Sequence, residues 1–153
     1  MGLARSIGAL FSRCASRFSK GPKPGENPER WLGRHGEDLA VRHLRRHRYK
    51  VLYRNFRPAR GGEVDIVCRD RTCDTLVFVE VKTRRTSYFG DPASAVTLEK
   101  QRLITRGAMA WLRMLERTDI LFRFDIVEVI VEETGTSINV IQNAFNLPEP
   151  YIP

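Results

Sequence analysis

The sequence predicts a mixed α/β fold in which helices flank a five-stranded sheet, in the order α-β-β-β-α-β-β. Two observations predict this fold. Apolar residues recur at helical spacing in two segments, residues 28–47 and 97–115, whereas Val, Ile, Phe and Tyr dominate the segments that follow each of them. Because the second helix can cross over between two parallel strands, we expect the sheet to be mixed.

The first helix has a readable start. Asn27 can serve as its N-cap, and Pro28 then takes the first helical position. Its expected buried stripe comprises Leu32, Gly36, Leu39, Ala40 and Leu44. Glu37 lies beside this stripe on the helical wheel, so we expect it to point along the edge of the buried face.

The strands follow from a change of period at Tyr49. Residues 50–57, 62–69 and 75–84 are predicted to form an antiparallel meander, with the third strand in a central position. After the second helix, a fourth strand is expected over residues 120–133 and a fifth over 138–145. The residues available for the buried side of the second helix are Leu98, Leu103, Ile104, Ala108, Trp111, Leu112 and Leu115.

The composition is that of one globular domain. The chain has 153 residues, of which 42% are hydrophobic and 29% charged, and no apolar tract is long enough to cross a bilayer. Three cysteines without a Cys-x-x-Cys pair argue against a zinc site or a disulfide framework and favour a cytoplasmic location. The net charge of +8 favours a polyanionic partner, although a solvated helix face would also account for part of it.

Residues 1–26 are predicted to be a basic, mobile extension. The first 25 residues contain no acid, and their apolar residues recur at helical spacing, a pattern that also suits a transit peptide or a membrane-surface helix. The Pro and Gly residues of KGPKPGENP separate this extension from the domain. The domain is expected over residues 27–146, and a Pro-rich irregular tail over 147–153.

Charged residues interrupt two of the most apolar strands. Because side chains alternate along a strand, Glu63 and Asp65 share one face of the second strand, and Glu80 and Lys82 share one face of the third. If these strands are neighbours, Asp65 and Glu80 approach each other and repel unless one takes a proton or a cation lies between them. An all-oxygen site of Asp65 and Glu80, with Glu37 as a third candidate, suits Mg²⁺ or Mn²⁺ better than Zn²⁺.

Such a cation could bind a phosphodiester oxygen, while Lys82 orients a water or stabilises charge in the transition state, which is the chemistry of a nuclease. The alternative is a polar outer face with cross-strand salt bridges, each contributing about 0.2–1 kcal/mol. The expected central position of the third strand argues against that alternative, since an exposed face is less expected there.

The segments GEVDIV and LVFVEVKTR, after a helix containing GRHGEDLA, resemble the YraN-like family of small bacterial proteins from about Trp31 to Phe145. The resemblance implies a restriction-endonuclease-like core of the PD-(D/E)xK superfamily, similar to archaeal Holliday-junction resolvases. It places the metal carboxylates on Asp65 and Glu80, the catalytic lysine on Lys82 and a helix-borne acid on Glu37. Val64 stands where the superfamily pattern has proline.

The predicted function is a Mg²⁺-dependent endonuclease that cleaves DNA, branched or structured DNA included. The alternative is a non-catalytic nucleic-acid-binding protein on a nuclease-like scaffold. Because related junction-cutting enzymes work as pairs, we expect a homodimer. Asp125 interrupts the fourth strand and is predicted to have a structural role, paired with Arg123 or with a base of the first helix.

The predicted phosphate contacts cluster around the ends of the strands and at the start of the second helix. Those at the strand ends are Arg57, Arg60, Arg84 and Arg85. Related nucleases use a helix-borne Lys or Gln to contact phosphate or water, which implicates Lys100 and Gln101. A solvent-facing helix start is an equally good interpretation of these two residues.

Overall fold

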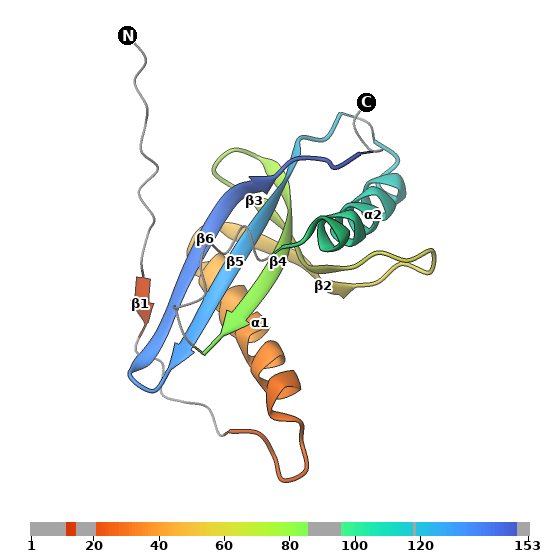
Figure 1. Cartoon of the computed structure of the whole chain (residues 1–153). Helices are drawn as coiled ribbons and strands as arrows, with labels where there is room; N and C mark the ends of the chain where they lie inside the picture. Colours follow the sequence, from red (N-terminus) through yellow and green to blue (C-terminus); the bar gives the residue numbers. More distant parts are fainter. Residues whose placement is uncertain (1–11, 15–20, 86–95, 118, 150–153) are drawn as a thin grey trace.

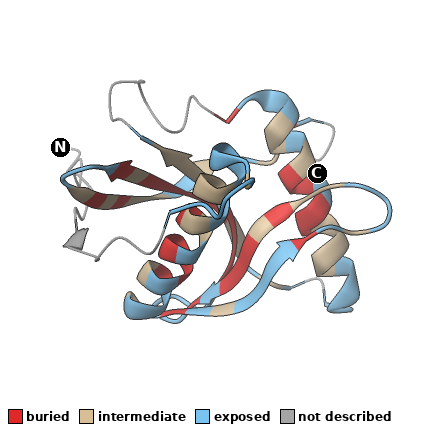
Figure 2. Ribbon diagram, turned by 90° about the horizontal axis from the view of Figure 1, so that it is seen from below, coloured by how far each residue is buried: buried red, intermediate tan, exposed pale blue. Residues whose placement is uncertain are grey.

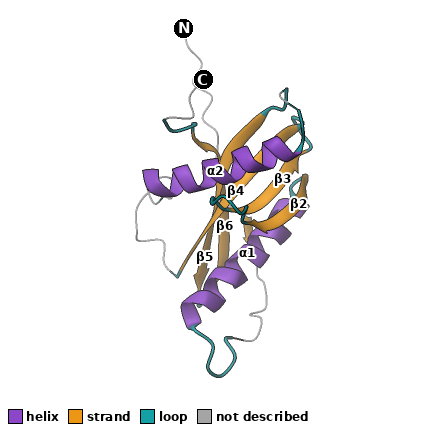
Figure 3. Ribbon diagram, turned by 90° about the vertical axis from the view of Figure 1, so that its right-hand side faces the viewer, coloured by secondary structure: helices purple, strands orange, loops and turns teal. Residues whose placement is uncertain are grey.

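Two helices pack on opposite faces of one sheet. The computed structural model describes residues 12–14, 21–85, 96–117 and 119–149, with only the backbone placed for 12–14. Figures 1 and 3 show α1 and α2 on either side of the strands. The elements are β1 Ser12–Cys14, α1 Pro28–Arg46, β2 Tyr49–Phe56, β3 Val64–Asp70, β4 Thr75–Arg84, α2 Leu98–Met114, β5 Phe122–Glu132 and β6 Gly135–Phe145.

The strand order is β1-β6-β5-β4-β3-β2. Strands β2, β3 and β4 form the predicted antiparallel meander, and β4 is parallel to β5 across the α2 crossover. Strand β6 returns antiparallel to β5. The predicted order of helices and strands is therefore confirmed, and β4 is central as expected.

Strand β1 was not expected. Ser12–Cys14 pair antiparallel with β6, with Arg13 opposite Ser137. The spacing of the apolar residues suggested a helix, but these three residues form a strand that extends the sheet. The remainder of the predicted extension, residues 1–11 and 15–20, lies outside the described residues.

Both helices begin at side-chain caps. Asn27 Oδ1 accepts from the backbone N–H groups of Glu29 and Arg30 at 2.9 and 3.1 Å, with Pro28 at the first helical position, as predicted. Thr97 Oγ1 caps α2 by accepting from the N–H of Lys100. These caps fix where each helix starts, and so which turn of it lies over the sheet.

The core has two halves, one on each face of the sheet (Figure 2). The half under α1 contains Leu39, Ala40, Leu44, Ile66, Cys68, Val77, Val79, Val127 and Val129, and the half under α2 contains Val67, Phe78, Ile104, Ala108, Phe124 and Ile126, among others. The predicted stripe of α1 is buried, apart from Leu32, which is partly exposed. In α2, however, Leu98 and Leu115 are 52% and 39% exposed, because the helix docks through its middle and its ends overhang the sheet.

Glycines let each helix approach closely at one point. A Cβ at Gly36 would lie 1.9 Å from Thr83 Oγ1, so α1 lies directly on β4. A Cβ at Gly62, whose φ is +102°, would lie 2.4 Å from the backbone nitrogen of Gly107 in α2.

No helix in the described residues is long and apolar enough to cross a membrane.

Candidate active site

The carboxylates of β3 and β4 meet where these two strands separate. Pairing of β3 with β4 ends at Ile66 opposite Val79, and the next step of the same register places Asp65 opposite Glu80. Strand β4 continues beside β5 as far as Arg84. At this divergence the backbone N–H of Val81 donates to Asp65 Oδ2 at 2.9 Å. Asp65 therefore lies where β3 no longer pairs with β4, and it is bonded to the residue that follows Glu80.

Glu80 is the buried acid of this site, with 3% of its surface exposed. Lys82 Nζ lies 3.1 Å from Oε1, and Lys100 Nζ lies 3.3 Å from Oε2. The second contact lacks hydrogen-bond geometry, so Oε2 has no hydrogen-bond partner among the described residues. Burial and then the neighbouring charge of Asp65 raise the pKa of Glu80 to about 7, although both lysines oppose this rise. Below, Asp65, Glu80, Lys82 and Lys100 are called the Glu80 cluster.

Glu37 approaches the same region from α1. The contact of Gly36 with Thr83 holds this turn of the helix against β4. Asn55 Nδ2 donates to Glu37 Oε2 at 3.1 Å. Burial raises the pKa of Glu37, the bond from Asn55 opposes the rise, and the charge of Asp65 adds to it. The predicted helix-borne acid thus lies within electrostatic reach of Asp65.

The three acids do not form a closed ligand set. No group of three His, Cys, Asp or Glu side chains in the described part of the chain could hold a metal ion by itself. Asp65 and Glu80 are therefore a two-carboxylate site with Glu37 nearby. Two carboxylates suit Mg²⁺, which commonly binds one or two and keeps waters and substrate oxygens as its other ligands.

Lys100 faces the acids and not the solvent. Its Nζ donates to Glu63 Oε1 as well as contacting Glu80. Burial lowers the pKa of Lys100, but the bond to Glu63 and the charges of Glu80 and Asp65 outweigh it and raise the pKa overall. Gln101 instead donates to the backbone carbonyl of Val96 at 3.0 Å.

Glu63 is a site residue that sequence reasoning did not select. It bonds both Lys100 and Arg57, and the bond from Lys100 is the main reason its pKa is lowered. Its backbone N–H donates to the carbonyl of Leu103 at 3.1 Å, which ties α2 to the start of β3. The available signal was that Glu63 and Asp65 share a strand face, but its partner could not be named before α2 was placed.

The four predicted phosphate contacts lie at different places. Arg57 is exposed and pairs with Glu63, and Arg60 is exposed on the connection between β2 and β3. Arg84 is largely covered and lies 3.9 Å from Glu128 of β5. Arg85 is exposed and lines a pocket of about 440 Å³ together with Trp31, Leu32, Val131, Glu132 and Glu133.

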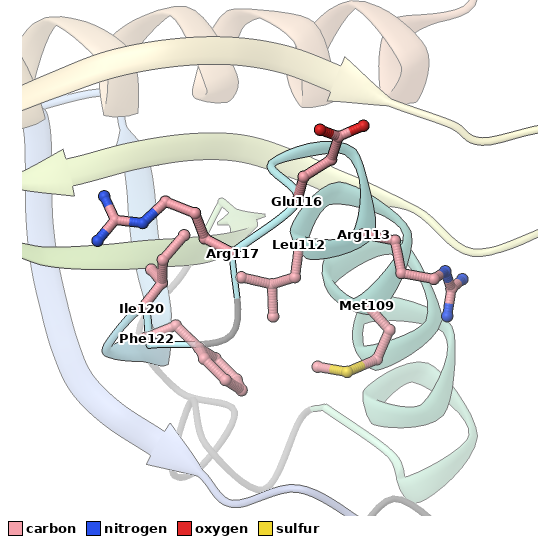
Figure 4. A pocket seen from close by; sticks show the side chains of 7 residues that line it. All are labelled: Met109, Leu112, Arg113, Glu116, Arg117, Ile120 and Phe122. Atoms are coloured by element: carbon pink, nitrogen blue, oxygen red, sulfur yellow. The ribbon is translucent and has the colours of Figure 1, made fainter.

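An apolar pocket of about 540 Å³ lies at the far end of α2, away from Lys100 (Figure 4). The side chains of Met109, Leu112 and Phe122 point into it, whereas Arg113 and Glu116 point away from it (Figure 4). None of the predicted site residues lines this pocket. Its lining offers no pair of carboxylates, so we do not connect it with the metal chemistry.

A second buried polar group, called the Arg123 cluster, consists of Tyr49, Asp70, Arg123 and Asp125. Arg123 donates to Asp125 Oδ1 at 2.9 Å, to Asp70 Oδ2 at 2.9 Å and to the Tyr49 hydroxyl at 3.1 Å. The predicted pairing of Asp125 with Arg123 is confirmed. Burial opposes ionisation of Asp70, but the bonds from Thr72 and Arg123 outweigh it and lower the pKa to about 2.

Comparison with known proteins gives a family. A family model described as uncharacterised protein family UPF0102 matches residues 36–129, a span that includes Glu37, Asp65, Glu80 and Lys82. A UPF0102 protein of Geobacter metallireducens is 50% identical over 116 residues, which cover 76% of this chain and 93% of that protein. A UPF0102 protein of Geobacter sulfurreducens is 50% identical over 124 residues, covering 80% and 94%. One from Caldicellulosiruptor saccharolyticus is 44% identical over 119 residues, covering 76% and 98%.

Proposed function

The chain belongs to the uncharacterised protein family UPF0102, a description that names no reaction, and from its site we propose that it is a metal-dependent endonuclease hydrolysing phosphodiester bonds in DNA. One observation carries the proposal. Glu80 is 3% exposed, one of its oxygens has no hydrogen-bond partner among the described residues, and it lies beside Asp65 of the neighbouring strand. A buried carboxylate with an unbonded oxygen beside a second acid is typical of a cation site.

The donor set fits Mg²⁺ or Mn²⁺. Asp65 and Glu80 would hold the ion through carboxylate oxygens, which both ions prefer, and Glu37 is the nearby third acid. The cation would offset the repulsion between Asp65 and Glu80, which adds to the effect of burial in raising the pKa of Glu80. When bound, it supplies positive charge to a phosphate oxygen and lowers the pKa of an attacking water.

Lys82 supplies the remaining charge that the reaction needs. Its ammonium group is held 3.1 Å from Glu80 Oε1, and 29% of the side chain is exposed, so it can meet a substrate while anchored to the site. Water adds to phosphorus and gives up a proton, one P–O ester bond breaks, and the leaving oxygen takes up a proton from solvent. Negative charge develops on the phosphoryl oxygens in the transition state. An ammonium group fixed beside those oxygens stabilises the transition state more than the substrate.

A polyanionic substrate also fits the charge of the chain, which has a net charge of +8. Exposed bases of α1, β2 and the turn between them contribute to this charge, namely Arg42, Arg45, Arg46, Arg48 and Lys50. The last two flank Tyr49, which pairs with Asp70 at the other end of β3 from Asp65. Basic residues attract the phosphate backbone irrespective of base sequence, which suits an enzyme that selects the shape of its DNA.

The test is cleavage of supercoiled plasmid and of a four-way junction in Mn²⁺, in Mg²⁺ or in EDTA. We expect cuts with either metal and none with EDTA. Asp65→Asn and Lys82→Ala should each lower the rate at least about 100-fold, since each removes a group acting on the transition state, while DNA binding and the circular dichroism spectrum stay close to wild type. Cleavage by Asp65→Asn at the wild-type rate would contradict the proposal.

Sedimentation with and without the junction tests the proposed homodimer.

A second candidate is a nucleic-acid-binding protein without catalysis. Glu80 already has two lysine partners, and Glu37 is bonded by Asn55 and lies 4.0 Å from Arg54, so internal bases offset much of the acidic charge. Junction binding with no cut in any metal, at protein concentrations that saturate the DNA, would favour this candidate.

A further inference from the structure

Five side chains of alternating charge run from the surface into the Glu80 cluster. In order they are Arg57, Glu63, Lys100, Glu80 and Lys82. The Arg57 side chain at the outer end is 63% exposed, whereas that of Glu80 is 4% exposed. Lys100 is the middle member, and it is the one base in this chain of contacts that touches two acids through the same Nζ.

The fold fixes Lys100 between those acids. Its own backbone N–H is bonded to the cap residue Thr97, so it lies in the first turn of α2. One turn later, the carbonyl of Leu103 accepts from the N–H of Glu63 at 3.1 Å, and the close approach of Gly107 to Gly62 fixes the helix to the start of β3. The helix cannot move away without breaking these contacts, so only the flexible lysine side chain can withdraw from Glu80.

Lys100 occupies the side of Glu80 that a cation would need. Its Nζ lies 3.3 Å from Oε2, the oxygen that has no hydrogen-bond partner among the described residues. An ammonium group and a divalent ion at the same buried carboxylate repel each other strongly, because few waters screen them. Glu63 already accepts a hydrogen bond from the same ammonium group, so Lys100 keeps an acidic partner when its contact with Glu80 is broken.

We propose that Lys100 is a positioning residue, the internal counterion of Glu80, and that a divalent cation breaks this ion pair while the bond of Lys100 to Glu63 remains. Without metal, Lys100 offsets part of the repulsion between the carboxylates of β3 and β4. With metal, Glu63 keeps the lysine, so no buried charge is left unpaired. This inference rests on the proposed metal site at Asp65 and Glu80.

The experiment is a calorimetric titration of the full-length chain with Mn²⁺, without DNA. Lys100→Met should tighten Mn²⁺ binding about fivefold or more, because the ion no longer displaces a charge. Glu63→Gln should weaken it by a similar factor, because Lys100 loses the negative charge that balances it once the ion has taken Glu80. Lys100→Arg restores the charge and should return the affinity toward the wild-type value. An unchanged or weaker affinity in a folded Lys100→Met protein overturns the proposal, as does an unchanged affinity in Glu63→Gln.

Two variants control for the general field of the protein. Arg102→Gln removes an exposed positive charge two residues from Lys100, and Glu99→Gln removes an exposed negative charge next to it. Both should change the Mn²⁺ affinity less than twofold, about the effect of an exposed charge. If they change it as much as the site variants do, a general charge effect is responsible and the counterion role is wrong.

The metal site itself is tested separately with Asp65→Asn. If that variant keeps the wild-type Mn²⁺ affinity, the proposed site fails and the counterion role fails with it. If Asp65→Asn loses Mn²⁺ while the Lys100 and Glu63 variants match wild type, only the counterion role is wrong. Circular dichroism establishes that each variant is folded, and Glu63→Gln carries the test alone should Lys100→Met not fold.

Discussion

The Glu80 cluster and the Arg123 cluster each join acids of different strands in the same sheet, yet their hydrogen-bond partners differ. In the Arg123 cluster one guanidinium bonds both Asp70 and Asp125, and the backbone N–H of Asn143 adds a further bond to Asp125. In the Glu80 cluster an oxygen of the most buried acid has no hydrogen-bond partner among the described residues. A planar guanidinium has several N–H donors in fixed directions and can bond two carboxylates at once. The two ammonium groups of Lys82 and Lys100 leave Glu80 Oε2 without a hydrogen bond.

The pKa values of the two clusters reflect this difference. The bonds from Thr72 and Arg123 lower the pKa of Asp70 to about 2 despite its burial, and burial with the charge of Asp65 raises the pKa of Glu80 to about 7. Burial also raises the pKa of Asp125, but Arg123 and Asn143 oppose it. The Arg123 cluster therefore has the properties of a structural ion-pair group, and the Glu80 cluster those of a site that can accept a ligand.

Removing Arg123 should have the largest effect on stability. Arg123→Met would leave Asp70 and Asp125 buried without their shared counterion, and we expect a loss of about 3–5 kcal/mol in the free energy of unfolding. Urea denaturation at neutral pH measures it. Arg69→Met removes an exposed arginine that pairs with Asp74, and as the control it should lower the free energy of unfolding far less. Equal losses in Arg123→Met and Arg69→Met would show that the Arg123 cluster stabilises the fold no more than an exposed ion pair does.

The two clusters should also differ in how they make the free energy of unfolding depend on pH. Because the pKa of Glu80 rises from 4.5 to about 7 on folding, its protonated form stabilises the fold, and this contribution is full below pH 4.5 and lost as the pH rises to about 7. Glu80→Gln should remove that decline, so the variant gains on the order of 2–3 kcal/mol relative to wild type between pH 4.5 and 7.5.

Urea unfolding at half-unit pH steps, in EDTA, measures this window. Glu99→Gln, at an exposed acid of α2, is the control and should keep the wild-type profile. A stability difference between wild type and Glu80→Gln that stays constant from pH 4.5 to 7.5 would contradict the raised pKa of Glu80. Asp70 works in the opposite direction, since its lowered pKa stabilises the fold above pH 3.8 and loses effect as the pH falls toward 2.

Local signals were enough to predict much of this arrangement. Period-2 alternation and the cap at Asn27 identify the helices and strands, and alternation alone places Asp65 and Glu80 on facing positions once their strands are neighbours. The same rule identified Asp125 as an interruption of an apolar strand and left its partner open between Arg123 and a base of the first helix. The structure selects Arg123, two residues away on the same face.

What could not be predicted depends on contacts between distant segments. The partner of Glu63 is set by where α2 docks, and the decisive contact, Gly62 with Gly107, joins residues far apart in sequence. The exposure of Leu98 and Leu115 has the same origin, because helical periodicity does not say where a sheet ends beneath a helix. Strand β1 forms because the outer edge of β6 accepts a short extended segment, and nothing within Ser12–Cys14 encodes that pairing.

The smallest of the three effects tests whether α1 serves the Glu80 cluster through Gly36. Gly36→Ala would place a Cβ 1.9 Å from Thr83 Oγ1, so helix and strand must separate, at a cost of about 1–3 kcal/mol. The shift should also move Glu37 away from Asp65 and lower the cleavage rate. Thermal unfolding and the plasmid assay measure the two effects.

Gly33→Ala is the matched control, because nothing lies within 4 Å of a Cβ at that position on the same helix. It should stabilise the chain by about 0.5–1 kcal/mol, the usual gain for alanine over glycine inside a helix. Adding Thr83→Ala to Gly36→Ala removes the two closest atoms and should recover part of both losses. If Gly36→Ala lowers stability but leaves cleavage unchanged, the close approach of α1 serves packing alone, and Glu37 is not part of the catalytic site.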